Sequence, residues 1–95
     1  MHVSYKSLGK VVPNPSKGMM RFEFAVPRSA RVRLTVVDVA GRAVATVANG
    51  NFNAGQYQAV WSGDMTDGGA APAGVYFVRF QAEGRNLIRR VVLAR

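Results

Sequence analysis

Apolar and polar residues alternate along most of the chain with a period of two, and no helical period of about 3.6 residues persists. Residues 20–26 (MRFEFAV) place four apolar side chains on one face and two charged side chains on the other. Residues 31–38 (RVRLTVVD) repeat the pattern, with Thr35 among the side chains expected to point outward. This alternation predicts half-buried strands of an antiparallel sheet.

Segments rich in Gly, Pro, Asn and Asp separate these strands and predict the turns. Further strands are predicted at 42–48, 56–62, 75–82 and 86–94, loops at 49–55 and 63–74, and a hairpin turn at 83–85. About seven short strands with turn signals every 8–12 residues or so predict an all-β fold, an immunoglobulin-like antiparallel β-sandwich. The 95 residues suffice for one domain, which we assign to residues 11–95, with residues 1–10 as a linker or frayed N-terminal segment.

Aromatic side chains are assigned mainly to the core. Trp61 is the only tryptophan, and we expect it to fill the space between the two sheets. In the strand that follows Gly74, Tyr76 and Phe80 share one face, while Phe77 shares the other face with Arg79. Few aromatic rings therefore remain for stacking on nucleic-acid bases.

The charge balance is basic, with 13 Lys and Arg against 5 Asp and Glu and a net charge of +8. Such a balance favours acidic partners: nucleic acid, phospholipid, lipopolysaccharide or an acidic protein face. The arginines are spread along the predicted strands, which is typical of a solvated sandwich surface, and we predict a monomer with no nucleic-acid partner. No apolar run approaches the roughly 18 residues of a membrane span, so no transmembrane segment is predicted.

Candidate chemistry is sparse. Cysteine is absent, which excludes disulfides and thiol catalysis. Asp64 and Asp67 lie among glycines and form a weak Ca²⁺ candidate, although two carboxylates three residues apart are more typical of Asx turns. His2 is the only histidine, and no paired carboxylates or activated serine are apparent. We therefore expect neither an enzyme nor a bound cofactor.

Several motifs occur in one order: PNPSKG, FEFAVP, VRLTVVDVAGRAV, AGQYQAVW, AGVYFVRF and a basic, apolar final strand. From about Val11 to Arg95 this order resembles the type A C-terminal sorting domain of type IX secretion cargo, found on surface and secreted proteins of the Bacteroidota. It is similar also to the immunoglobulin-like domain of the flagellar hook-capping protein. Ser62 departs from the acidic residue that the sorting-domain pattern has after its tryptophan.

The resemblance assigns structural motifs to positions of this chain. They are an entry motif, a DxxGR turn, a tryptophan–glycine element and a GxY element: Pro13, Asn14, Pro15, Asp38, Gly41, Arg42, Trp61, Gly63, Gly74 and Tyr76. Arg89 and Arg90 match the basic pair that precedes the last apolar strand.

What the resemblance implies is a non-catalytic secretion signal that carries a larger cargo across the outer membrane, for surface attachment or release. The implied partners are the outer-membrane secretion machinery, a surface sortase and anionic lipopolysaccharide. The implied locations are the periplasm in transit and then the cell surface or the medium. The residues expected to be recognised are in the last strand, where unpaired backbone groups could accept an added strand: Arg89, Arg90, Val91, Val92, Leu93 and Arg95.

A second interpretation stays open. The alternative to the sorting signal is a structural or adhesive immunoglobulin-like module, either hook-cap-like or an accessory domain of a secreted enzyme. A sorting domain ends its parent reading frame and follows an N-terminal signal peptide, whereas an adhesive module needs neither feature.

Overall fold

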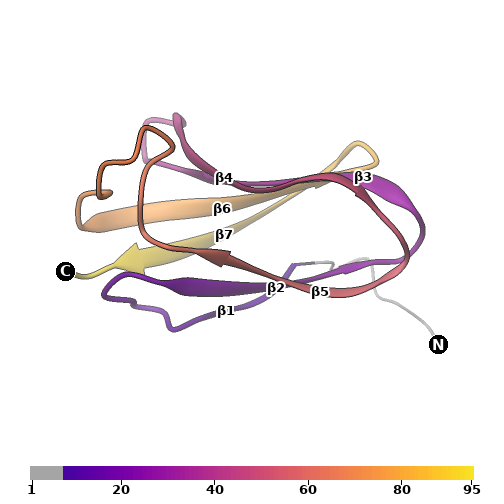
Figure 1. The fold of residues 1–95 in the computed structure, drawn as a ribbon, viewed down its shortest axis with the longest axis horizontal. Coiled ribbons are helices and arrows are strands. Elements are labelled where there is room, and N and C mark those ends of the chain that lie inside the picture. Colours follow the sequence, from indigo (N-terminus) through magenta and orange to yellow (C-terminus); the bar gives the residue numbers. More distant parts are fainter. Residues whose placement is uncertain (1–7) are drawn as a thin grey trace.

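The computed structural model describes residues 8–95, which form two antiparallel β-sheets packed face to face (Figure 1). One sheet has the order β1-β2-β5, and the other has the order β4-β3-β6-β7. The strands are β1 (Leu8–Val12), β2 (Met20–Val26), β3 (Ala30–Val37), β4 (Ala43–Phe52), β5 (Gly55–Trp61), β6 (Gly74–Ala82) and β7 (Arg85–Leu93). The predicted all-β, immunoglobulin-like sandwich is thus confirmed. Within the described part of the chain, no helix is long and apolar enough to cross a membrane.

Two strand boundaries differ from the sequence-based ones by more than one residue. Strand β1 begins at Leu8, three residues before the predicted start of the sandwich. The rest of the predicted linker or frayed segment 1–10, namely residues 1–7 with His2, lies outside the described residues. The predicted loop at 49–55 is wrong for residues 49–52, because β4 continues to Phe52 in register with β3. The ring of Phe52 packs edge-on against Phe24, with centroids 5.5 Å apart. Pairing and packing with distant residues therefore outweigh the loop-like composition of this segment.

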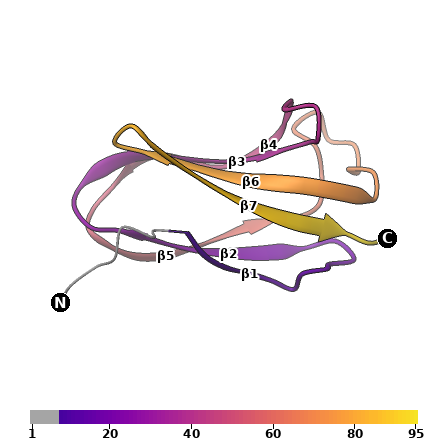
Figure 2. The same cartoon turned by 180° about the vertical axis from the view of Figure 1, so that it is seen from behind.

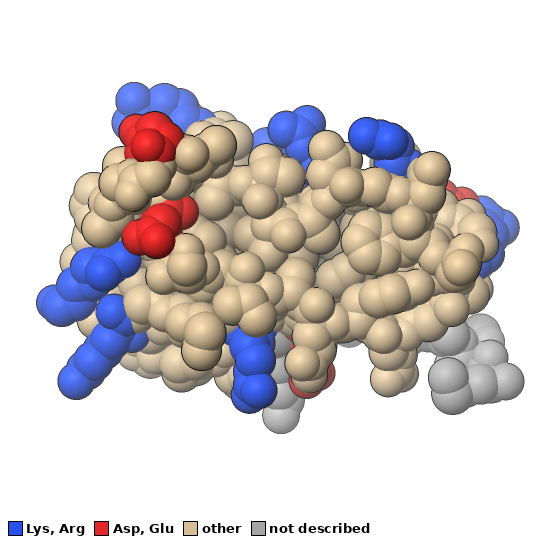
Figure 3. All heavy atoms as spheres, in the orientation of Figure 1, with Lys and Arg blue, Asp and Glu red and all other residues tan. Residues whose placement is uncertain are grey.

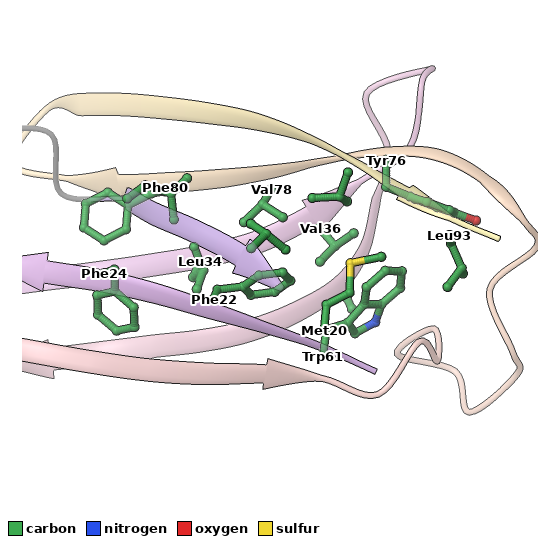
Figure 4. Close-up of a cluster of buried hydrophobic side chains, with 14 of the residues drawn as sticks. Met20, Phe22, Phe24, Leu34, Val36, Trp61, Tyr76, Val78, Phe80 and Leu93 are labelled. Carbon is green, nitrogen blue, oxygen red and sulfur yellow. The ribbon is translucent and has the colours of Figure 1, made fainter. Parts of the chain in front are cut away.

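The inward faces of the two sheets interdigitate to form one core (Figure 4). Phe22 and Phe80 are among its largest fully buried side chains, and Trp61 packs edge-on against Tyr76 with ring centroids 5.5 Å apart. The prediction that Trp61 fills the space between the sheets is confirmed. Each large apolar side chain buried in this way stabilises the fold by roughly 1.5–3 kcal/mol.

One residue of β3 departs from the predicted pattern of burial. Thr35 lies on the side of its sheet that faces away from the core, as expected, yet only 1% of its surface is exposed. Arg79 of β6 is its direct cross-strand partner, and directly opposed side chains share a face of the sheet. The Thr35 Oγ1 atom has no hydrogen-bond partner.

A two-residue turn joins β6 to β7, and it confirms the predicted hairpin. Glu83 and Gly84 both have positive φ angles, 51° and 74°, as in the type I′ turns that match strand twist. Arg28 donates to both carboxylate oxygens of Glu83, at 2.8 and 3.1 Å. This hydrogen bonding lowers the pKa of Glu83, and burial opposes it only in part.

Candidate functional site

The last strand, β7, contains most of the residues predicted to recognise a partner, and the structure separates them into two groups. Val91 and Leu93 point between the sheets and belong to the core. Arg90 and Val92 pair with Phe77 and Val75 of β6 and point to the opposite side. Packing thus accounts for Val91 and Leu93, while the recognition role of the whole set stays a prediction.

The edge of β7 is covered by the PNPS segment, which lies beside it (Figure 2). The Ser16 amide donates to the Val92 carbonyl at 2.9 Å, and the Ala94 amide donates to the Ser16 carbonyl at 2.6 Å. The side chain of Asn14 adds two bonds: its Oδ1 accepts from the Val92 amide at 3.0 Å, and its Nδ2 donates to the Arg90 carbonyl at 3.3 Å. We call residues 14–16 the strand clamp.

The strand clamp corrects the expectation of an open edge along the whole of β7. From the Arg90 carbonyl to the Ala94 amide, the outward-facing backbone groups are already bonded within the chain, so strand addition is blocked there. By the period of two, Ile88 presents its backbone to the same edge. Among residues 8–95, no hydrogen-bond partner is found for the Ile88 backbone groups on this edge.

Two of the predicted recognition arginines bind backbone carbonyls of their own chain. Arg89 donates from Nη2 to the Leu8 carbonyl at 2.7 Å, which ties β7 to β1 across the open side of the sandwich. Arg95 donates from Nε to the Ala71 carbonyl at 3.0 Å and from Nη2 to the Gly63 carbonyl at 2.8 Å. Both guanidinium groups therefore fasten the fold.

The DxxGR motif forms the turn between β3 and β4. Asp38 Oδ1 accepts from the amides of Ala40 and Arg42, both at 2.9 Å, while Oδ2 accepts from Arg42 Nε at 3.1 Å. Gly41 has a φ of 82°, a conformation that side chains disfavour. The pKa of Asp38 is lowered, first by the hydrogen bond from the Arg42 amide.

The tryptophan–glycine and GxY elements meet at one end of the sandwich. Trp61 Nε1 donates to the Asp64 carbonyl at 2.8 Å, and the Tyr76 hydroxyl donates to the Pro72 carbonyl at 2.5 Å. Burial raises the pKa of Tyr76, and the nearby Asp38 charge raises it further. Both polar tips therefore hold the β5–β6 loop against the core.

The calcium candidates Asp64 and Asp67 lie in that loop and are bonded locally. Asp67 Oδ1 accepts from the Gly69 amide at 2.9 Å, which is an Asx turn, and Asp64 Oδ2 accepts from Ser62 Oγ at 3.2 Å. Among the described residues, no three His, Cys, Asp or Glu side chains group as a metal site would require.

Sequence reasoning missed the strand clamp. Asn14 and Val92 are 78 residues apart, and their contact has no signal in a local pattern. The alternation within β6 did place Phe77 and Arg79 on its outward side. A signal that could have been used is that β3, β6 and β7 contain arginines, while these strands and β4 contain no Asp or Glu.

Comparison with known proteins gives one family match. The family described as FlgD Ig-like domain matches residues 9–86, from β1 to the beginning of β7. The comparison with curated proteins gives no match. The matched range ends before Arg89, so it includes the structural motifs and excludes the six predicted recognition residues.

Proposed function

Since the chain belongs to the FlgD Ig-like domain family, we propose that it is a non-catalytic structural module that holds a protein–protein contact. The family match over residues 9–86 is the observation that carries this proposal, and the way the polar side chains are used supports it. Asp38, Arg89 and Arg95 are each bonded to backbone groups of loops or neighbouring strands. Such bonds rigidify a scaffold, and a rigid scaffold suits presentation of a binding face.

The test uses the protein that contains this chain. Residues 8–95 are replaced by an unrelated β-sandwich of similar size, and a second version lacks the segment. We expect both versions of the protein to accumulate normally but to be absent from the assembly that contains the natural protein. Native gel electrophoresis and size-exclusion chromatography measure whether each version is present in that assembly. Retention of the assembly by the replacement would reduce the domain to a spacer and overturn the proposal.

A second proposal is the type IX sorting signal, with the outer-membrane machinery, a surface sortase and anionic lipopolysaccharide as partners. The order of the motifs favours it, together with the position of the PNPS segment beside the basic last strand. Arg90 and Val92, which point away from the core, would be the side chains read by a receptor. An arginine at such a contact sets orientation and association rate more than affinity.

The two proposals predict different cellular locations for a protein whose contact is disrupted. Deletion of residues 89–95 is uninformative, because it removes core residues Val91 and Leu93. We use Arg90→Glu instead, with Arg21→Glu on the exposed side of β2 as the matched control. A sorting signal requires that the Arg90→Glu protein accumulate in the periplasm while the Arg21→Glu protein is exported. Unchanged export of both would reject Arg90 as a sorting contact and leave the structural module in place.

A further inference from the structure

The side of the four-stranded sheet that faces away from the core is a continuous mixed surface, which we call the outer face. Directly opposed residues on neighbouring strands share a face, so the strand register defines its members. Across β3, β6 and β7 they form four rows: Val75–Val92, Val37–Phe77–Arg90, Thr35–Arg79–Ile88 and Arg33–Gln81–Asn86. Strand β4 adds Ala43, Thr46 and Asn49 opposite Val37, Thr35 and Arg33. In Figure 3, Lys and Arg side chains project along the rim above this sheet.

The outer face has an apolar centre that no other described element covers. Ile88 is 64% exposed, Val75 is a second exposed apolar side chain two rows away, and the half-buried Phe77 lies in the row between them. Val37 is only 8% exposed, yet it is not part of the core cluster, because its neighbours on the outer face cover it. Contiguous exposed apolar residues with a polar rim are typical of a protein interaction site.

The outer face is cationic and lacks counter-charges. Strands β3, β4, β6 and β7 contain no Asp or Glu, and four of their six arginines lie on the outer face: Arg31, Arg33, Arg79 and Arg90. The five carboxylates of the chain belong to β2, to the turns after β3 and β6, and to the β5–β6 loop. The guanidinium groups of Arg33 and Arg90 have no hydrogen bond or ion pair with any described residue.

The middle row of the outer face contains unsatisfied polar atoms. Arg79 Nε is buried and has no hydrogen-bond partner, and the same holds for Thr35 Oγ1 directly opposite. Most buried polar groups in folded proteins are bonded, so two neighbouring exceptions need a reason. Arg79 Nε is itself closed to solvent, so a carboxylate brought by a partner would bind the exposed part of this half-buried side chain and supply its charge with the acceptor that its own sheet lacks.

We propose that the outer face binds a partner protein whose contact surface has an apolar centre and a rim of Asp and Glu. The apolar centre meets Val75, Phe77 and Ile88, and the acidic rim meets the arginines. This inference rests on the proposed structural function and specifies the surface that performs it. Charge complementarity of this kind fixes orientation and excludes wrong partners.

Two other occupants fit the outer face less well. A second copy bound face to face would bring Arg33, Arg79 and Arg90 against the same arginines. Nucleic acid would satisfy the charges, but valine and isoleucine offer no flat ring for base stacking, and Phe77 is the only aromatic side chain among the four rows. Both become outcomes of the test.

The test is photo-cross-linking in cells that make the full protein, with p-benzoylphenylalanine in place of Ile88. The matched control places the same probe at Val60, which is 52% exposed on the three-stranded sheet beside Arg21 and Gln58. We expect one discrete adduct from the Ile88 position and none from Val60, with the cross-linked peptide, mapped by mass spectrometry, rich in Asp and Glu. Arg79→Glu should reduce the adduct at least about tenfold, and Arg79→Lys should retain more of it.

Each remaining outcome overturns the inference. These are a nuclease-sensitive adduct, an adduct with twice the mass of the protein, equal cross-linking from Val60, and an adduct unaffected by Arg79→Glu. Circular dichroism of each purified variant separates loss of binding from loss of folding. If the adduct fails while replacement of residues 8–95 still abolishes the assembly, the outer face is rejected and the structural function stands. If neither experiment has an effect, both are rejected.

Discussion

Gly63 is the position where the structure makes the sharpest energetic prediction. Its φ is 88°, and a Cβ atom added there would lie 2.8 Å from Arg95 Nη2 and 3.1 Å from the Gly18 carbonyl oxygen. An L-residue at such a φ costs about 1–2 kcal/mol. The Arg95 side chain can move aside, but it then loses its bond to the Gly63 carbonyl.

The Gly63→Ala variant should therefore lose about 2–3 kcal/mol of unfolding free energy. A hydrogen bond from a charged donor contributes roughly 1.5–3 kcal/mol, and we use about 1 kcal/mol because Arg95 is partly exposed to water. In urea, with a slope of about 1–1.5 kcal/mol per molar, the unfolding midpoint should fall by about 1.3–3 M. Fluorescence of the single tryptophan, Trp61, follows the transition.

A double-mutant cycle isolates the contact. In an Arg95→Ala background, Gly63→Ala should cost only the backbone contribution of about 1–2 kcal/mol, which gives a coupling of about 1 kcal/mol. Gly50→Ala is the control, because its added Cβ meets nothing within 4 Å and its φ is ordinary. It should be neutral, or stabilising by up to about 1 kcal/mol. Wild-type stability of Gly63→Ala, or strict additivity in the cycle, would refute the reasoning.

Three further predictions concern single side chains. Asn14→Ala should cost about 1–2 kcal/mol and speed hydrogen exchange of the Val92 amide, and an unchanged exchange rate would mean that the strand clamp does not stabilise β7. Tyr76→Phe should cost about 1–1.5 kcal/mol in urea unfolding, more than Tyr57→Phe, whose hydroxyl bond is exposed; equal costs would contradict the role of burial. The lowered pKa of Asp38 means that its stabilisation is present above pH about 3.8 and is lost as the pH falls through the folded-state pKa, so Asp38→Asn should flatten the melting-temperature profile below that pH, whereas an unaltered profile would contradict it.

Much of the fold was predictable because the period of two is a local property. The inward residues of β2 and β6 follow from alternation alone, and burial confirms them. The buried position of Trp61 was predictable because a small domain has few places other than its core for a ring of this size. Such features depend on residues close in sequence, which a single sequence records.

Features that depend on distant residues were not predictable. Residues 49–52 have loop-like composition, and only pairing with β3 makes them part of a strand. The burial of Thr35 depends on Arg79, which is 44 positions later in the chain (79 minus 35). The candidate site follows the same rule, since the strand clamp joins Asn14 to Val92.

The cross-strand pairs of the outer face indicate that stability alone did not select them. Arg79 lies opposite Ile88, although an acidic residue there would stabilise the pair by roughly 0.2–1 kcal/mol. Ile88→Glu should therefore raise the unfolding midpoint slightly, while it removes the apolar centre of the outer face and abolishes partner binding. Urea unfolding and the mobility of the full protein's assembly on native gels measure the two effects. A variant that is more stable and still binds would show that the outer face has no part in recognition.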